Sequence, residues 1–385
     1  MSTVKLSDVA IESRDSLKEK DKSLPVVGLE HLIPEQINLT DWNIGQDNTF
    51  TKIFEKGDVL FGRRRAYLKK AAVAPCKGIC SGDITVIRAR EDKILPELLP
   101  FVIQNDIFFN YAVGKSAGSL SPRVKWEHLA NYEFNLPELD EQKKLAEILW
   151  QIVATMESYK KLLAKTDEMV KAKFVEMFGT IEKTKWKVVN ISTTLAGIVS
   201  NGFFAKKEEY NDSGNISVLG VTNIVNTLYS KIENLPRANA STSDIKKFSV
   251  KYGDILFCRS SLVAEGIGKA SVVPKNTPAD TLFECHVIRL PLNLELCNPE
   301  FLQIQLSLPF CRNQILAQAK TVTMTTIGQS EILKTNIILP PIELQQKFAI
   351  FIQKSEESKV AIQSSLNSLS AVYKKIIAEN LGGSN

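Results

Sequence analysis

Three short motifs in this chain carry the residue types of known chemical sites, and each lacks a required part. Gly114-Lys115-Ser116 resembles the end of a phosphate-binding loop, but Phe109 stands where that loop needs its first glycine. Asn298-Pro299-Glu300-Phe301 is close to the Asn-Pro-Pro-aromatic motif of amino-methyltransferases, but Glu300 replaces the second proline and no glycine-rich strand precedes it. Glu141-Gln142-Lys143 matches the end of a nuclease signature without its upstream aspartate. The sequence therefore predicts no catalytic residue.

The cysteines and histidines are too few and too scattered to predict a metal site. Cys76 and Cys80 stand four apart and Cys285 neighbours His286, so the six cysteines include no Cys-x-x-Cys pair. The chain has three histidines, His31, His128 and His286, which do not suit a histidine-rich metal or acid–base site. We expect buried free thiols and no bound metal ion.

Two stretches rich in basic and hydroxyl side chains occur in each half of the chain, and they suit DNA. Arginine can bind guanine through two hydrogen bonds, lysine neutralises phosphate, and hydroxyls contact phosphates or base edges. A lone basic run is more often an ordinary solvated loop, but here the pair of stretches recurs. The candidate DNA-binding residues are Arg63, Arg64, Arg65, Lys69, Lys70, Lys115, Ser119, Ser121 and Arg123, and then Arg259, Ser260, Ser261, Lys269, Lys320, Thr323, Thr325 and Thr326.

The same landmarks surround these stretches in both halves of the chain. The run from Gly57 to Phe61, followed by Arg63, recurs as the run from Gly253 to Phe257, followed by Arg259. The copies lie about 192 to 203 residues apart, which is half the chain and too long for a solenoid repeat. Further matches are Val86-Ile87-Arg88 with Val287-Ile288-Arg289, and Leu136-Pro137 and Gln142 with Leu339-Pro340 and Gln345. The sequence indicates a duplicated domain pair with a shared frame and divergent loops.

Each copy shows mixed helix and strand patterns, which predicts an α+β fold. Strands are expected at Val59–Phe61, Ile84–Ile87 and Ile255–Phe257, which are bounded by glycines. Helical spacing of apolar residues covers Ile103–Tyr111 and Phe301–Leu316. Upstream of these, Pro96 and Pro299 are each expected to open a helix as its first residue.

Each copy ends in a long helix with a heptad pattern. Gln142–Met177 has no proline or glycine and is about 36 residues, or roughly 54 Å, long. Two amphipathic helices that each lie on their own domain are the alternative. Five unbroken heptads favour an antiparallel coiled coil that holds one domain at each end about a pseudo-two-fold axis, with Lys173, Ser355 and Lys359 fixing its register. The expected seam residues are Leu145, Leu149, Ile152, Met156, Tyr159, Leu163 and Val170, and Phe348, Ile352, Ile362, Leu366, Leu369, Tyr373 and Ile376.

Composition agrees with a folded chain of several domains. The chain has 385 residues, of which 44% are hydrophobic and 24% charged, and its net charge of +5 permits a polyanionic partner without requiring one. No apolar run is long enough to span a membrane and the first residues lack a signal-peptide core, so we expect a cytoplasmic protein. The expected segments are a first domain at 1–136, a first helix at 137–179, a second domain at 180–339 and a second helix at 340–381.

Three features together resemble the specificity subunit of type I restriction-modification enzymes. They are the doubled Gly-Asp-hydrophobic-hydrophobic-Phe-x-Arg run, the doubled Leu-Pro-x-x-x-x-Gln that opens a long helix, and Phe178-Gly179 with Trp186-Lys187 ahead of the second copy. The resemblance covers essentially the whole chain. It implies two target recognition domains that each bind half of a split double-stranded DNA site. The helices would set the spacer and dock two methyltransferase subunits, which restriction subunits then join.

The resemblance implies that this chain is not itself an enzyme and binds no cofactor, because S-adenosylmethionine belongs on the methyltransferase subunits. Arg63 and Arg259 are carried over as loop candidates because they adjoin the matched strand. The alternative is a non-catalytic coiled-coil adaptor that assembles proteins without reading DNA. An autonomous methyltransferase is a third reading.

Overall fold

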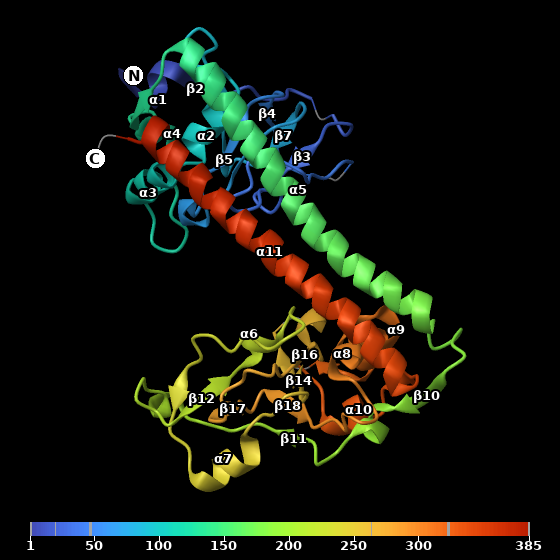
Figure 1. Cartoon of the computed structure of the whole chain (residues 1–385). Helices are drawn as coiled ribbons and strands as arrows, with labels where there is room; N and C mark the ends of the chain where they lie inside the picture. The colour runs from blue at the N-terminus through green and yellow to red at the C-terminus, as the bar shows by residue number, and fades with distance from the viewer. Residues whose placement is uncertain (1, 20, 46–47, 263, 322–323, 384–385) are drawn as a thin grey trace. The chain divides into compact units, whose positions relative to one another are not determined.

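A computed structural model describes residues 2–19, 21–45, 48–262, 264–321 and 324–383, which fold into two compact units. Unit 1 comprises Met1–Lys161 and Gln363–Asn385, and unit 2 comprises Leu162–Ile362. Each unit contains small sheets, short helices and part of both long helices, α5 (Leu139–Phe178, green in Figure 1) and α11 (Ile342–Leu381, red). The α+β fold predicted from the sequence is confirmed.

Unit 1 is built on a four-stranded antiparallel sheet in the order β2 (Ala10–Ser13), β8 (Ile84–Ala89), β5 (Val59–Gly62) and β6 (Ala71–Val73). A second sheet has the order β3 (Val26–Val27), β7 (Gly78–Cys80) and β4 (Lys52–Phe54), and β1 (Ser2–Lys5) pairs with β9 (Glu133–Leu136). The helical segments are α1 (Leu6–Val9), η1 (Ala66–Leu68), α2 (Leu99–Ile103), α3 (Asp106–Gly114) and α4 (Trp126–Leu129).

Unit 2 repeats the main sheet in the order β11 (Ser200–Asn201), β18 (Val287–Leu290), β14 (Ile255–Cys258) and β16 (Ala270–Val272). The other sheets are β13 (Arg237–Ala238), β12 (Ile216–Leu219) and β17 (Thr281–Phe283), then β15 (Ser260–Ser261), β20 (Thr325–Thr326) and β19 (Lys320–Thr321), and the pair β10 (Lys187–Asn190) and β21 (Asn336–Leu339). The helical segments are η2 (Ile191–Thr194), η3 (Lys207–Glu209), α6 (Val221–Ile224), α7 (Thr242–Phe248), η4 (Ala264–Gly266), α8 (Pro299–Ser307), α9 (Pro309–Gln318) and α10 (Gln329–Leu333).

The repeated Gly-Asp pair forms the turn that leads into the central strand of each main sheet. Gly57 has a φ of 91° and Gly253 a φ of 86°, a left-handed conformation that side chains disfavour. The next carboxylate closes the turn, because Asp58 accepts from the main-chain N of Glu55 at 2.8 Å and Asp254 from that of Lys251 at 2.9 Å. The repeated Gly-Asp motif therefore has a structural role in forming this turn.

The pairing of strands corrects one detail of the sequence match between the copies. In unit 1, Val59 lies opposite Ile87, whereas in unit 2 the equivalent Ile255 lies opposite Leu290. The match of Val86-Ile87-Arg88 with Val287-Ile288-Arg289 is thus displaced by two residues. A shift of two returns every side chain to the same face of a strand, so the sequence pattern alone could not detect it.

The helices that follow the main sheets are shorter than the sequence pattern predicts. The expected Ile103–Tyr111 helix divides into α2 and α3 at Asn105, whose side chain accepts from the N of Ile107. The expected Phe301–Leu316 helix divides into α8 and α9 ahead of Pro309. Proline restricts the preceding residue to extended backbone, which ends a helix while leaving the apolar spacing unchanged.

Only one of the two prolines opens a helix as its first residue. Pro299 begins α8, and the Asn298 side chain caps that helix by accepting from the N of Phe301 at 2.9 Å. Pro96 lies in a turn three residues before α2 begins at Leu99. Leu95 occupies the place of Asn298 by sequence and has no side-chain acceptor for a cap.

The seam residues lie buried or half-buried along both long helices, and the ends of the seam join the globular cores. Leu145 and Leu149 belong to the core of unit 1, while Phe348 and Ile352 belong to that of unit 2. Within unit 1 the two helices approach each other at Phe101, whose ring contacts both Trp150 of α5 and Tyr373 of α11. The coiled-coil arrangement is therefore confirmed, and parts of both helices also pack on the globular cores, as the alternative interpretation expected. The helix surface is a mutual seam in part and a domain-docking face in part.

Of the polar seam residues, one forms a contact between the two long helices and two form contacts within their own helix. Lys359 of α11 binds Asp167 of α5 at 2.7 Å and Glu356 of its own helix at 2.8 Å. Ser355 is buried and donates to the main-chain O of Phe351, whereas Lys173 pairs with Glu176 one turn along its helix. Lys359 is therefore the seam residue that bonds across the helix pair. Within the described residues, none of the helices is sufficiently long and apolar to cross a lipid bilayer.

Candidate nucleic-acid interface

In unit 1 the two polar stretches predicted from the sequence lie against one another. Arg64 and Arg123 face each other in an antiparallel bridge, and the N of Arg65 donates to the main-chain O of Pro122 at 2.8 Å. The side chains also meet, because Nε of Arg64 donates to Oγ of Ser121 at 2.5 Å. Two segments some fifty-seven residues apart in the chain thus form one surface, which we call the unit 1 loop pair (63–65 and 115–123).

Asp83 holds the two segments of this loop pair together. Its carboxylate accepts from Nε of Arg123 at 2.7 Å and from Nη1 of Arg64 at 3.4 Å. Hydrogen bonding to Arg123, with the charges of both arginines, lowers the pKa of Asp83 below its usual range against the opposing effect of burial. Asp83 is therefore ionised at neutral pH, and both guanidinium groups are held in defined positions.

The loop pair leaves several side chains accessible to a partner. Arg65 is exposed and sits in a left-handed conformation with a φ of 55°. Lys115 is exposed above the ring of Tyr111, and Ser119 is exposed beside Leu120. Because the cations of this surface outnumber Asp83, the surface suits an anionic ligand such as DNA.

Unit 2 builds the same arrangement from strands. Ser260 and Ser261 in β15 pair with Thr326 and Thr325 in β20, which also pairs with β19. The exposed His286 lies at hydrogen-bond distance from this sheet, with Nδ1 3.2 Å from Oγ of Ser260. We call these strands with His286 the unit 2 loop pair. Its hydroxyl and imidazole groups can donate and accept hydrogen bonds.

Four of the predicted DNA-binding residues have side chains that are engaged within the fold. Lys69 binds Asp106 at 2.6 Å in a cluster with Glu35 and Lys374 of α11, and Lys70 donates to the main-chain O of Leu29. Lys269 donates to Asn226. Thr325 is buried, and its hydroxyl lies 2.9 Å from that of Thr321. The three lysine contacts depend on distant segments, which a local sequence pattern does not reveal.

The remaining predicted residues lie within or next to the loop pairs. Arg63 and Arg259 are half-buried at the ends of the central strands, and Nη1 of Arg259 donates to the main-chain O of Cys285. Lys320 is exposed in β19. Thr323 lies outside the described residues. Asp83 and His286 were not among the residues predicted from the sequence, and they directly precede β8 and β18. Because the sequence match of these two strands is displaced by two residues, it would not have paired Asp83 with His286.

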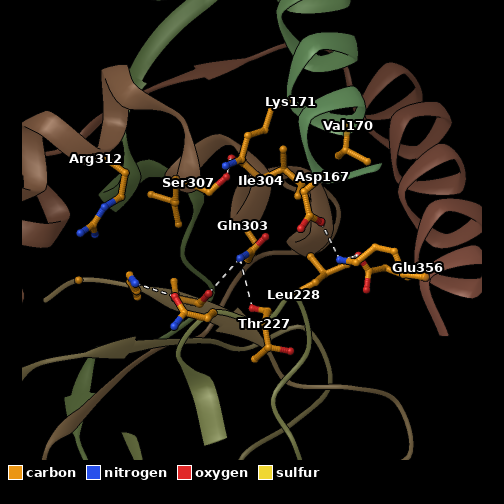
Figure 2. A pocket seen from close by; sticks show the side chains of 16 residues that line it. Asp167, Val170, Lys171, Thr227, Leu228, Gln303, Ile304, Ser307, Arg312 and Glu356 are labelled. Carbon is orange, nitrogen blue, oxygen red and sulfur yellow. Dashed lines mark hydrogen bonds and ion pairs between the residues drawn. The ribbon is translucent and has the colours of Figure 1, made fainter. Parts of the chain in front are cut away.

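A cavity of about 420 Å³ in unit 2 is one alternative place for a ligand. Figure 2 shows that Asp167 and Lys171 of α5, Glu356 of α11 and Gln303 of α8 line it. Three of its charged groups are paired with one another, since Lys359 binds the carboxylates of Asp167 and Glu356, and Arg312 donates to the main-chain O atoms of Ile267 and Glu265. The Ser307 hydroxyl donates to a main-chain carbonyl rather than to a base.

The cysteines are free in the described part of the chain, and four of the six are buried. Burial raises the pKa of Cys80, Cys297 and Cys311 to about 12, so these thiols are neutral and unreactive at pH 7. Among the described residues, no group of three histidine, cysteine or acidic side chains could hold a metal ion. The loop pairs are the sites that the geometry favours.

A family model of the type I restriction modification DNA specificity domain matches residues 1–166 and 183–369. The specificity subunit of the type I restriction enzyme EcoKI, from Escherichia coli (strain K12), is 23% identical over 270 residues. That match takes in 66% of this chain and 57% of the relative, so the chain spans little more than half of the relative's length.

Two solved structures share the fold. The type I restriction-modification S subunit from M. genitalium has a TM-score of 0.55 at 10% identity, over 100% of this chain and 96% of that one. A chain from work on the complex assembly and conformational transition of the type I R-M system has a TM-score of 0.53 at 19% identity, over 98% and 97%.

Proposed function

This chain belongs to the family of type I restriction modification DNA specificity domains, and we propose from that membership that it is the specificity subunit of a type I restriction-modification enzyme. Residues 1–136 and 180–339 form its two target recognition domains. Each binds one half of a bipartite site in double-stranded DNA. The observation that carries this proposal is the repeated loop pair, in which one backbone frame presents arginines in unit 1 and hydroxyls with a histidine in unit 2.

In this proposal residues 137–179 and 340–381 are spacer helices that dock two methyltransferase subunits. Support comes from apolar side chains on the solvent side of these helices, where Leu162 and Met169 of α5 are each 48% exposed and Val360 of α11 is 68% exposed. Exposed apolar groups on paired helices suit protein partners. Restriction subunits join the resulting modification complex.

The chain itself carries no catalytic group in this assignment. S-adenosylmethionine binds the methyltransferase subunits, which methylate adenine at the DNA site that this chain recognises. The complex acts in the cytoplasm. The alternative function as a protein adaptor has no comparable support, because it does not explain why the two loop pairs carry different side chains.

The test is reconstitution of the chain with its own methyltransferase subunits, S-adenosylmethionine and unmethylated genomic DNA. Single-molecule sequencing should then show adenine methylation at one motif with two specified halves and an unspecified spacer. The chain alone should bind no S-adenosylmethionine. A complex that assembles and methylates without a bipartite motif, or does not methylate at all, would leave the adaptor reading in place.

A further inference from the structure

Hydrogen bonds define which loop residues of the two units are equivalent. The O of Arg63 accepts from the N of Val124 at 3.0 Å, and the O of Arg259 accepts from the N of Ile327 at 3.1 Å. The N of Arg63 donates to the O of Asp83 at 3.0 Å, as that of Arg259 does to the O of His286 at 2.9 Å. These matching bonds place Asp83 and His286 at the same point of the frame.

The same frame makes two further positions equivalent. Arg64 follows Arg63 and bridges Arg123, while Ser260 follows Arg259 and pairs with Thr326. The third strand agrees, because Ala117 bridges Arg123 and Lys320 pairs with Thr326. Each unit therefore brings three side chains from distant segments to one place, Arg64, Asp83 and Arg123 in unit 1 and Ser260, His286 and Thr326 in unit 2.

These triplets differ in chemistry more than in position. In unit 1, Asp83 accepts from Nε and Nη2 of Arg123 and from Nη1 of Arg64. Those bonds leave N–H groups unused on both guanidiniums, whose side chains are 39% and 44% exposed. In unit 2, Nδ1 of His286 lies against the Ser260 hydroxyl, and the triplet contains no guanidinium.

We propose that each triplet is the specificity-determining set of its target recognition domain, an inference that rests on the proposed function. In unit 1, Asp83 is a positioning residue that fixes Arg64 and Arg123 for contact with guanine, whose O6 and N7 accept two hydrogen bonds from arginine. Fixing these side chains before binding lowers the entropy cost of the contact. The Ser260–His286–Thr326 triplet selects a different base at the equivalent place of the second half-site.

An Arg–Asp cluster that only holds the loops together is the competing explanation. Under that explanation a loss of Asp83 weakens the fold or the overall DNA affinity without changing which bases are selected. Base preference at single positions therefore distinguishes the two, whereas affinity alone does not.

The experiment maps the methylated motif of the reconstituted complex for Asp83→Ala and for Arg123→Lys. The lysine variant keeps the charge but loses the planar fork, so it should retain phosphate attraction and lose base selection. Both variants should reduce guanine preference at one position of the first half-site by about tenfold or more, with the second half-site unchanged. Ser260→Ala and His286→Ala should relax one position of the second half-site alone.

Arg14→Ala is the matched control, because Arg14 is an exposed arginine of unit 1 that pairs with Glu12 and Glu127 outside the triplet. It should leave both half-sites intact. If wild-type and triplet variants select the same bases at every position, the triplet inference is wrong while the proposed function stands. If the wild-type complex selects no bipartite motif, the proposed function fails and the triplet assignment fails with it.

Discussion

Some basic side chains of unit 1 bind groups within the fold, whereas others are exposed to solvent. Arg88 binds both carboxylate oxygens of the buried Asp58, at 2.8 and 2.7 Å, and the ammonium of Lys70 is held by the main-chain O of Leu29. Arg65 is exposed on the unit 1 loop pair, and its main-chain N is fixed by Pro122. Its side chain is thus presented to solvent from a fixed backbone.

Arg65→Ala should weaken DNA binding and reduce its salt dependence. If Arg65 contacts a phosphate, one counterion fewer is released, and the slope of log affinity against log salt should become shallower by about one. Fluorescence anisotropy of the reconstituted complex over a salt series measures this slope. Lys70→Ala is the control and should leave the slope unchanged. Equal slopes for Arg65→Ala and wild type would place Arg65 away from the DNA backbone.

Asp254 predicts a pH dependence of stability in unit 2. Burial is the main cause that raises the pKa of Asp254 to about 6, against weaker opposing effects of the Lys251 main-chain bond and the Arg289 charge. The pKa of Asp254 is higher in the folded protein than in the unfolded chain, so ionisation of this carboxyl destabilises the fold. The free energy of unfolding should therefore fall as the pH rises from about 4 to about 6. Relative to Asp254→Asn, the wild type should therefore lose about 2 to 3 kcal/mol between these limits. Urea unfolding of both proteins at pH 4 and pH 7 measures this difference, and a difference that is the same at both pH values would contradict it.

At the scale of elements, one buried glutamine fastens the start of each long helix. Gln142 accepts from the N of Leu95 at 3.0 Å and donates to the O of Pro137 at 2.9 Å. Gln345 accepts from the N of Asn298 at 2.9 Å and donates to the O atoms of Leu296 and Pro340. This explains the repeated Leu-Pro-x-x-x-x-Gln motif, since one amide satisfies the helix start and the preceding segment together.

Gln345→Ala should lower the free energy of unfolding by about 2 kcal/mol or more, because it leaves buried main-chain groups without partners. Gln346→Ala removes an exposed amide one residue away and should change stability little. Urea titration followed by circular dichroism compares the two variants. A similar midpoint for both would mean that the amide of Gln345 is dispensable for the docking of α11.

For the whole molecule, the proposed function makes the long helices the determinant of spacer length. One heptad inserted after Tyr159 of α5 and another after Ile362 of α11 should lengthen the unspecified spacer and preserve both half-sites, because seven residues keep the seam in register. Methylation mapping of the reconstituted complex reads out the motif. The same insertion in one helix alone should disrupt assembly. Recovery of the original spacer from the double insertion would exclude the helices as the ruler.

Exchange of residues 1–136 for the corresponding domain of another family member tests the division of the chain. Only one half of the bipartite motif should change, because the second domain keeps its own loop pair. A change in both halves would show that the domains do not read DNA independently. The same methylation map measures this outcome.

The sequence by itself determined the duplication, the strands beside each Gly-Asp turn and the two long helices. Those features depend on local periodicity and on turn residues such as Gly57 and Gly253, which neighbouring residues are enough to express. The tertiary structure decided which of the predicted polar residues stand together. Only pairing between distant segments brings Arg64 and Arg123 to Asp83 and joins Lys69 to Asp106 and Lys269 to Asn226. The same pairing sets a strand register that differs by two residues from the sequence match of the two copies. Such contacts depend on the packing of a whole unit, and a two-residue shift leaves the alternation of a strand unchanged.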